Sequence, residues 1–95
     1  MLRLTVISQT PEQAVLQVDG WVSGANVTLL EEEGTRLLQD AECLVLDLSG
    51  VRTIDQAGIG LLQAWSHEGV SLRGGSLFLR TLLEANGLDL EDLRA

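Results

Sequence analysis

The run CLVLDL, residues 43–48, is the feature that most restricts what this chain can fold into. It is apolar at every position up to Asp47, a pattern typical of a central strand that is covered on both faces. Stretches of helical periodicity stand before and after it. Because strands that alternate with helices form sheets with parallel neighbours and right-handed crossovers, the run predicts an α/β domain.

Two stretches ahead of this run alternate apolar and polar residues with a period of two. They are LRLTVI, residues 2–7, and AVLQVD, residues 14–19, joined by a loop that contains Pro11. Such alternation predicts strands with one covered face, so we expect an antiparallel hairpin. Farther along, VSLR at residues 70–73 predicts a further short strand.

The period changes to that of a helix over residues 23–39. Either Ser23 or Asn26 could cap this helix, and Thr28 with Glu31 has the spacing of a capping box. The apolar face of the helix is predicted to hold Val27, Leu30, Gly34, Leu37 and Leu38.

The acidic triplet Glu31–Glu33 belongs to the outer side of this helix. Consecutive helix positions point in different directions, so the triplet indicates a solvated face rather than a metal site. Glu32 stands four residues before Arg36, an order that stabilises helices, and we expect this ion pair.

A second helix is predicted from Asp55 to about His67, with its end at Gly69. The positions that share its apolar face are Gly58, Leu61, Leu62 and Trp65. This spacing of i, i+3, i+4 and i+7 favours a core position for the Trp65 side chain.

A third helix is predicted to begin at Ser76, with an apolar stripe of Leu79, Leu82 and Leu83. Gly87 fits the left-handed position that follows a helix. The tail, residues 89–95, predicts at most a helical turn and no full strand. The predicted order is therefore ββαβαβα, a small mixed sheet packed with helices in a single domain, residues 1–95.

Length and composition fit one small globular domain. The chain has 95 residues, of which 45% are hydrophobic and only 3% aromatic, so its core must be aliphatic. No apolar run approaches the ~18 residues of a membrane span. The first residues also make a poor signal peptide. We therefore expect a cytoplasmic protein without direct membrane insertion.

The net charge of −8 argues against nucleic-acid binding. Lys is absent, and the arginines are scattered: Arg3, Arg36, Arg52, Arg73, Arg80 and Arg94. An acidic chain would favour a basic partner surface.

No residue pattern supports catalysis, a metal centre or a cofactor. Cys43 opens the central apolar run and is expected to be a small buried hydrophobe. The lone His67 lies near a predicted helix end, where histidine is often exposed. Roles at a strand end and in capping account for Asp47 and Asp55, and no metal-ligand spacing is found in the sequence.

The stretch IDQAGIG, residues 54–60, joins the central strand to the second helix. Asp55 can accept hydrogen bonds from the backbone near Ala57 and Gly58, and its charge complements the positive end of the helix. Gly58 and Gly60 would let the first turn lie close to another backbone. Capping and packing account for most of this pattern, although a helix start of this kind can also hold a phosphate.

Residues 44–65, LVLDLSGVRTIDQAGIGLLQAW, resemble the signature of the STAS domain, a family named for sulphate transporters and anti-sigma-factor antagonists. In that family a buried strand ends in Asp-Leu-Ser-Gly-Val, and Asp-Ser-Ser-Gly or a variant opens the second helix. The segments VDGWV and LLEANGL resemble the end of the second strand and the end of the last helix. The resemblance covers nearly the whole chain and implies a STAS-like fold.

The resemblance also implies a function. In bacterial anti-sigma-factor antagonists of this family, a Ser or Thr just before the motif glycine, or one earlier, is phosphorylated by a partner kinase, which is also the anti-sigma factor. The matching positions here are Gln56 and Ala57, which carry no hydroxyl, so we expect no phosphorylation there and constitutive binding.

A second role is left open by the same motif. Some family members that serve as small cytoplasmic subunits of phospholipid-trafficking transporters carry Asp-Thr-Ala-Gly, which DQAG matches at three of four positions. An accessory subunit of such an ABC transporter, or of a multi-protein signalling assembly, is therefore the alternative.

The resemblance places the partner-binding surface on the turn and on the loop that follows the second strand. Trp21 lies in this loop, where partner contact and packing are equally open. A homodimer is left open, and a regulatory nucleotide site is the weakest alternative. The expected partner-binding residues are Ile54, Asp55, Gln56, Ala57, Gly58, Ile59, Gly20, Trp21 and Ser23.

Overall fold

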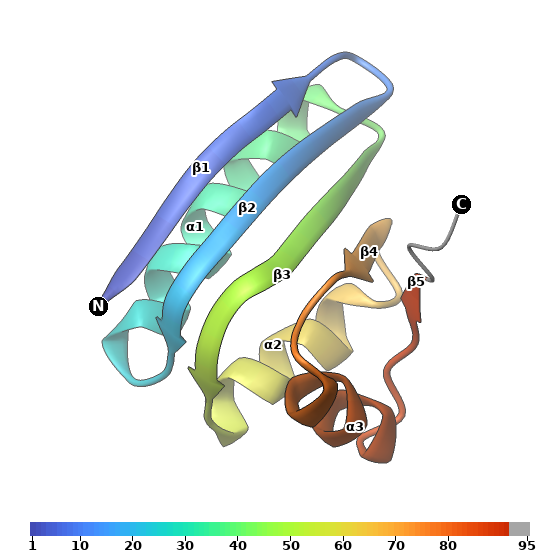
Figure 1. Ribbon diagram of the computed structural model, residues 1–95. Helices are drawn as coiled ribbons and strands as arrows, with labels where there is room; N and C mark the ends of the chain where they lie inside the picture. The colour runs from blue at the N-terminus through green and yellow to red at the C-terminus, as the bar shows by residue number, and fades with distance from the viewer. Residues whose placement is uncertain (92–95) are drawn as a thin grey trace.

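The computed structural model describes residues 1–91 of the chain and is shown in Figure 1. The elements are β1 (Leu2–Gln9), β2 (Gln13–Val22), α1 (Ala25–Asp40), β3 (Cys43–Ile54), α2 (Gln56–Trp65), β4 (Val70–Arg73), α3 (Leu77–Ala85) and β5 (Leu90–Glu91). The predicted order ββαβαβα is confirmed, and β5 is an addition to it.

The strands form one mixed sheet in the order β1-β2-β3-β4-β5 (Figure 1). β1 and β2 are antiparallel, which confirms the predicted hairpin, and every later pair is parallel. Parallel neighbours place their carboxyl ends at the same edge of a sheet. The helices that follow β3 and β4 therefore both start from that edge.

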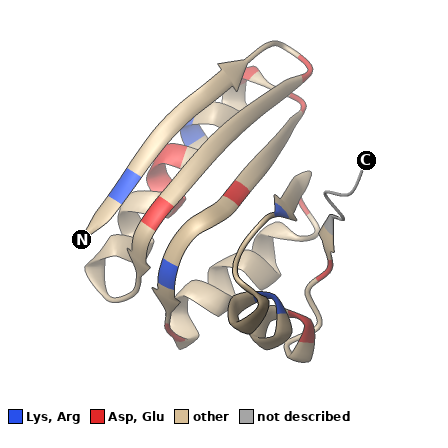
Figure 2. Ribbon diagram, viewed as in Figure 1, with Lys and Arg blue, Asp and Glu red and all other residues tan. Residues whose placement is uncertain are grey.

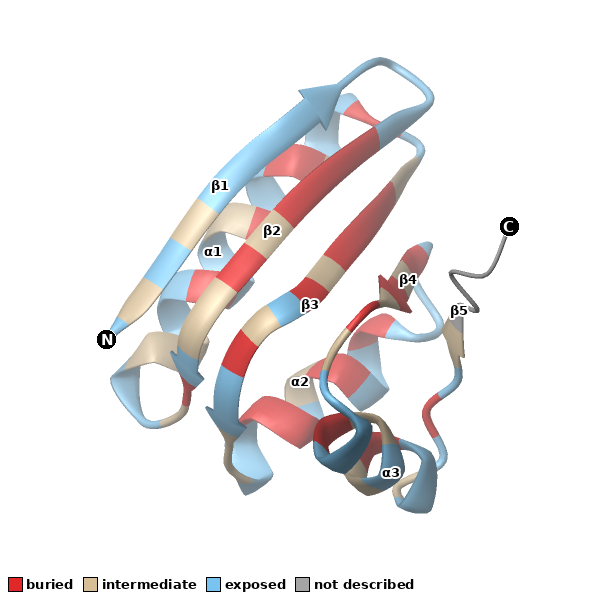
Figure 3. Ribbon diagram, in the orientation of Figure 1, coloured by how far each residue is buried: buried red, intermediate tan, exposed pale blue. Residues whose placement is uncertain are grey.

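All three helices contribute to a single core on one face of the sheet. Leu16 of β2 and Leu46 of β3 are fully buried in the same cluster as Leu37 of α1, Leu62 of α2 and Leu83 of α3. Figure 3 shows this burial along β2 and β3 and on the helix sides that face them. The core is aliphatic, as the composition predicts.

The opposite face of the sheet carries no helix in the part of the chain that the structure describes. Val15 and Val45, neighbours in the β2–β3 register, are buried there outside the main cluster. Cys43 and Asp47 are only half-buried. The prediction that residues 43–48 are covered on both faces is therefore wrong, because the continuous apolar run combines one helix-covered face with a valine pair on the other.

The apolar run that predicts the central strand ends at Leu48, but β3 continues to Ile54. β2 is correspondingly longer and ends at Val22. Pairing of the two strands resumes after a register shift, with Asp19 opposite Gly50, and after a second shift it ends with Val22 opposite Ile54. A Cβ at Gly50 would overlap the Asp19 carboxylate. This glycine is a packing requirement of the strand pair rather than the start of a loop.

The start of α1 differs from the prediction. Its N-cap residue is Gly24, with φ 58°, and no described side chain caps the helix. The Asn26 side-chain N–H instead donates to the Trp21 carbonyl oxygen at 3.1 Å. Neither Ser23 nor Asn26 is the cap, and the capping box at Thr28 is wrong.

Arg36 pairs with Glu33 and not, as predicted, with Glu32. The Arg36 Nη2 atom lies 2.6 Å from Glu33 Oε2, one turn earlier in the helix. The hydrogen bond from Arg36 lowers the pKa of the Glu33 carboxyl. Glu31 and Glu32 are exposed, as expected of a solvated face.

α1 and α2 meet where Gly34 faces the ring of Trp65. A Cβ at Gly34 would overlap this ring, so the absence of a side chain makes room for the indole. Trp65 is 4% exposed, which confirms its core position.

α3 is capped by Ser76, whose hydroxyl oxygen accepts from the Leu79 N–H at 3.1 Å. Gly87 has φ 81°, which confirms the predicted left-handed residue after the helix. Leu90 and Glu91 then pair with β4, so a helical turn is wrong for these two residues; residues 92–95 lie outside the described part of the chain. None of the described helices is long and apolar enough to cross a membrane.

Candidate functional site

Asp55 lies between β3 and α2 and caps the helix. Its backbone is extended, with φ −104° and ψ −176°, and its Oδ1 atom accepts a hydrogen bond from the Gly58 N–H at 2.9 Å. The Asp55 N–H donates to the Val22 carbonyl oxygen at 3.1 Å, which fixes the turn to the end of β2. This is the cap that the sequence predicts.

The same carboxylate also holds the start of α1. Asp55 Oδ2 accepts from the Gly24 N–H at 3.0 Å, and Gly24 is the N-cap residue of α1. One side chain thus joins the first turns of two helices. The hydrogen bonds from Gly24 and then Gly58 lower the pKa of the Asp55 carboxyl. Sequence reasoning missed the bond to Gly24, because local spacing carries no information about a contact between residues so far apart in the chain.

Gly58 is the point of close approach in this turn. It is buried, and a Cβ would lie 2.7 Å from both the Val22 carbonyl oxygen and Ile54 Cγ1. Gly60 meets nothing within 4 Å, so its predicted role in close packing is wrong. The first turn of α2 needs one glycine, at position 58.

The proposed contact residues differ in how accessible they are. Gln56 and Ala57 are exposed on the first turn of α2, and Ile59 is 5% exposed and belongs to the core. Gly58 is buried as well. Neither Gly58 nor Ile59 is placed to touch a partner, and both instead support the exposed first turn of α2 from within the fold. The half-buried members of the set are Ile54, Asp55, Gly20 and Ser23.

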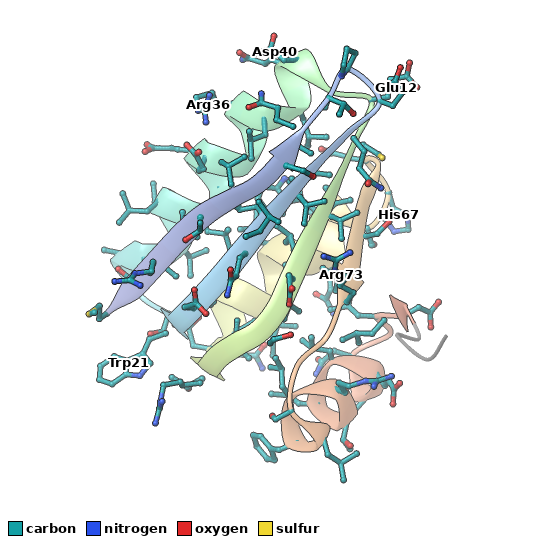
Figure 4. All side chains as sticks on the ribbon, turned by 45° about the horizontal axis from the view of Figure 1, so that its top comes forward. Glu12, Trp21, Arg36, Asp40, His67 and Arg73 are labelled. Atoms are coloured by element: carbon teal, nitrogen blue, oxygen red, sulfur yellow. The ribbon has the colours of Figure 1, made fainter. Side chains whose placement is uncertain are left out.

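Trp21 is 51% exposed at the end of β2. Its backbone is held on both sides, since the Trp21 N–H donates to the Met1 carbonyl oxygen at 2.8 Å and Asn26 bonds to its carbonyl. Figure 4 shows the side chain of Trp21 pointing away from the body of the sheet. The structure therefore decides against packing of this indole in the core.

Leu77 and Phe78 are exposed apolar residues that the sequence reading passed over. They are 82% and 77% exposed on the first turn of α3. α3 follows β4 as α2 follows β3, so both helix starts leave the same edge of the sheet (Figure 1). The sequence held a signal, because both residues stand outside the stripe that begins at Leu79.

The residues weighed as catalytic or metal-binding are not brought together. His67 is exposed after α2, and the thiol of Cys43 donates to the Glu12 carbonyl oxygen at 3.4 Å. Cys43 is half-buried, so the prediction that it is a small buried hydrophobe is wrong. Among the described residues, no group of His, Cys, Asp and Glu could hold a metal ion.

Asp47 makes a separate local arrangement on β3. Its Oδ1 atom accepts from the Ser49 N–H at 3.0 Å and from the Ser49 hydroxyl at 2.7 Å. The Arg73 Nη2 atom lies 3.9 Å from Asp47 Oδ2. Burial opposes the charged form, but the hydrogen bonds from Ser49 and the charge of Arg73 hold the pKa of Asp47 below its usual value.

Comparison with known proteins identifies the family. The family model described as "Mlab, STAS domain" matches residues 5–94. No curated protein sequence matches the chain significantly. Three solved structures are similar to it over most of their length.

An anti-sigma factor antagonist from Mycobacterium paratuberculosis is 21% identical, with a TM-score of 0.82, over 98% of this chain and 88% of that one. The anti-sigma factor antagonist SpoIIAA in its unphosphorylated form is 18% identical, with a TM-score of 0.71, over 99% of this chain and 90% of that one. The Bacillus cell fate determinant SpoIIAA in the phosphorylated form is 17% identical, with a TM-score of 0.68, over 93% and 85%. At these identities the likeness shows a shared fold.

Proposed function

Because this chain belongs to the STAS domain family, we propose that it is a bacterial regulator that works in the cytoplasm by binding another protein. Its structure resembles those of anti-sigma factor antagonists. The partner proposed first is an anti-sigma factor or another protein with a kinase-like fold. The chain itself is proposed to have no catalytic activity.

The observation that carries this proposal is the exposed first turn of α2, which has no hydroxyl group. Gln56 and Ala57 are exposed there, on a turn that Asp55 holds to both β2 and α1. A phosphate on such a surface would add a dianion that repels a closely fitting partner. Without an acceptor hydroxyl at these positions, the surface stays in its binding form.

Exposed apolar side chains along the same edge of the sheet as this turn support a protein partner. Trp21, Leu77 and Phe78 are each at least half exposed, and two of them are aromatic in a chain with only 3% aromatic residues. Aromatic anchors at the centre of an interface carry much of its binding energy. The proposed contact surface is therefore the turn after β3, the end of β2 and the first turn of α3.

The test uses purified anti-sigma-factor kinases of the host organism, with binding measured in the presence and absence of ATP. We expect binding that ATP does not change, and no phosphate on the protein. The matched variant Ala57→Ser restores a hydroxyl, and we expect ATP to weaken its binding. Binding of the unmodified chain that ATP weakens, or phosphate found on any of its residues after incubation with the kinase, would refute constitutive binding.

A second candidate is an accessory subunit of an ABC transporter. The motif DQAG favours it, since it matches at three of four positions the Asp-Thr-Ala-Gly version carried by transporter-associated members. Purification of the tagged protein from its host, followed by mass spectrometry, separates the two candidates. An ATPase subunit would support the transporter role, and a small kinase-fold protein would support the first.

A further inference from the structure

A hollow of about 590 Å³ lies beside Trp21, on the face of the sheet opposite the helices. Its walls come from three strands, with Arg3 on β1, Gln17 and Asp19 on β2, and Arg52 on β3. Because side chains alternate between the faces of a strand, and their neighbours along β1 and β2 belong to the core face, these side chains belong to the open face.

The hollow is positive in an otherwise acidic protein. The chain carries a net charge of −8, and its arginines stand singly along the ribbon (Figure 2), yet Arg3 and Arg52 both line this space. Within residues 1–91, neither arginine has a carboxylate within 4 Å. Asp19 is the one acid among the lining residues, so the hollow keeps an excess of positive charge.

Asp19 lines the hollow together with the two arginines. Its Oδ1 atom accepts from the Gln17 side-chain amide at 3.4 Å, and its carboxylate lies where a Cβ of Gly50 would be. Arg3 stands opposite Asp19 in the β1–β2 register, but neither Arg3 nor Arg52 forms an ion pair with a carboxylate among residues 1–91, so both guanidinium groups are available to a ligand. A carboxylate, with one charge, suits this space better than a doubly charged phosphate, because the charge of Asp19 repels a dianion more strongly.

Trp21 adds an apolar wall to the same space. The indole is 51% exposed, and Figure 4 shows it projecting from the end of β2. An indole next to a guanidinium suits a ligand that combines an aromatic ring with an acid, since the ring packs on Trp21 while the acid pairs with an arginine. Tryptophan and arginine are also the residue types that most often dominate protein interfaces.

We propose that this hollow receives an acidic segment of the protein partner, in which a Glu or Asp stands next to an aromatic residue. The carboxylate pairs with Arg52 and Arg3, and the aromatic ring lies on Trp21. The assignment of this segment to the regulatory partner rests on the proposed function; the chemistry of the hollow does not. An acidic segment at this hollow differs from the expectation that an acidic chain favours a basic partner surface.

The experiment is an NMR titration of the ¹⁵N-labelled full chain with the peptide Ac-Glu-Phe-Glu-NH₂. The chain has two tryptophans, so each indole N–H can be followed separately. We expect the Trp21 signal to move and the signal of Trp65, which is 4% exposed, to stay. The peptides Ac-Lys-Phe-Lys-NH₂ and Ac-Glu-Ala-Glu-NH₂ test the charge and the ring, and both should bind more weakly.

Charge reversal gives the second arm. Arg52→Glu should weaken binding of the acidic peptide about fivefold, the scale of an exposed ion pair, and Arg3→Glu should act in the same direction. Arg80→Glu on α3 is the matched control and should leave the affinity unchanged. An unmoved Trp65 signal shows that each variant is folded.

Several results would overturn the proposal. They are equal binding of the lysine peptide, an equal loss with Arg80→Glu, a Trp21 shift produced as readily by inorganic phosphate, or a shift on concentrating the protein alone, which would indicate a second copy in the hollow. Gln56→Arg separates the two proposals, because it should impair docking of the whole partner and leave peptide affinity unchanged. If the acidic peptide fails to bind while the whole partner docks, only the proposal for the hollow is refuted. If the whole partner fails to dock while the peptide binds, only the proposed function is refuted.

Discussion

The pattern Asp-x-x-Gly occurs twice in this part of the chain. The first quartet, DLSG at residues 47–50, lies within β3, and the second, DQAG at residues 55–58, begins directly after the end of β3. The first stays within the strand, where Asp47 bonds to Ser49 two residues ahead. The second turns the chain into α2, where Asp55 bonds to Gly58 three residues ahead and also to Gly24.

The difference lies in what β2 offers alongside. Beside the first quartet β2 continues, and Asp19 pairs with Gly50 in the parallel ladder. Beside the second quartet β2 has ended at Val22, whose carbonyl oxygen accepts the Asp55 N–H as the last bond of the β2–β3 ladder. An identical spacing of acid and glycine therefore takes its conformation from the neighbouring strand.

The largest expected effect distinguishes the two glycines. Gly58→Ala places a methyl group against the Val22 backbone and should lower the free energy of unfolding by about 2 kcal/mol, the usual cost of overpacking. Gly50→Ala meets only the Asp19 side chain, which can rotate, and should cost less. Urea unfolding measures both. Gly60→Ala is the control, since it meets open space inside a helix and should be neutral or stabilising. Equal costs at 50 and 58 would contradict the comparison.

The next effect separates the two acids. Asp55→Ala removes hydrogen bonds to both helix starts and should lower the thermal midpoint more than Asp47→Ala, which removes bonds within one strand. Asp55→Asn keeps one acceptor oxygen, so its thermal midpoint should lie between those of Asp55→Ala and Asp47→Ala. Amide exchange is the sharper measurement, because Asp55→Ala should speed exchange of the Gly24 and Gly58 amides together. An unchanged rate at Gly24 would show that the link to α1 contributes nothing.

A smaller effect concerns acid. Both aspartates have pKa values below the usual one, so each binds fewer protons in the folded state than in the unfolded chain. Their stabilisation is complete above the ordinary pKa, about 4, and is lost as the pH falls through the folded value. Unfolding midpoints measured from neutral pH to about pH 2 should fall less steeply for Asp55→Asn and Asp47→Asn. A slope unchanged in both variants would contradict these pKa shifts.

The smallest expected effects come from removing the hydroxyl of the first quartet and from adding one to the second. Ser49→Ala removes the hydroxyl bond to Asp47 and should cost about 0.5 kcal/mol, at the low end for a single hydrogen bond. Ala57→Ser adds a hydroxyl at an exposed helix position and should cost about as little, through helix propensity. Thermal unfolding of the two variants checks this, and a large loss for Ala57→Ser would mean that the turn is not open to solvent.

Much of the fold could be predicted from sequence, because periodicity reports which side of an element is covered. The hairpin, the order of elements, the Asp55 cap and the core position of Trp65 all depend on spacing within one element. The continuation of β3 past Leu48 could not be predicted this way, because it depends on pairing with β2. β5 also depends on pairing with a neighbouring strand, β4, and its two residues are too few to show a period.

Within the candidate site, the cap was visible in the sequence but its second partner was not. The Asp55–Gly24 bond joins two turns that only the β2–β3 pairing brings together. The exposure of Trp21 could not be decided either, because the alternation that marks the second strand in the sequence ends at Asp19, although β2 continues to Val22. The exposed pair Leu77 and Phe78 was readable as a departure from the apolar stripe.

The bond between Asp55 and Gly24 also determines where the chain can accept extra residues. The connection between β2 and α1 has little slack, because an added residue there would carry Gly24 away from the carboxylate that closes both corners. The exposed tip of the hairpin accepts bonds from Glu42 and Cys43 through the Pro11 and Glu12 carbonyl oxygens, but these join it to the start of β3 and not to α2. A peptide tag or fluorescent label is therefore better inserted at that tip, at the opposite end of β2 from the proposed binding surface.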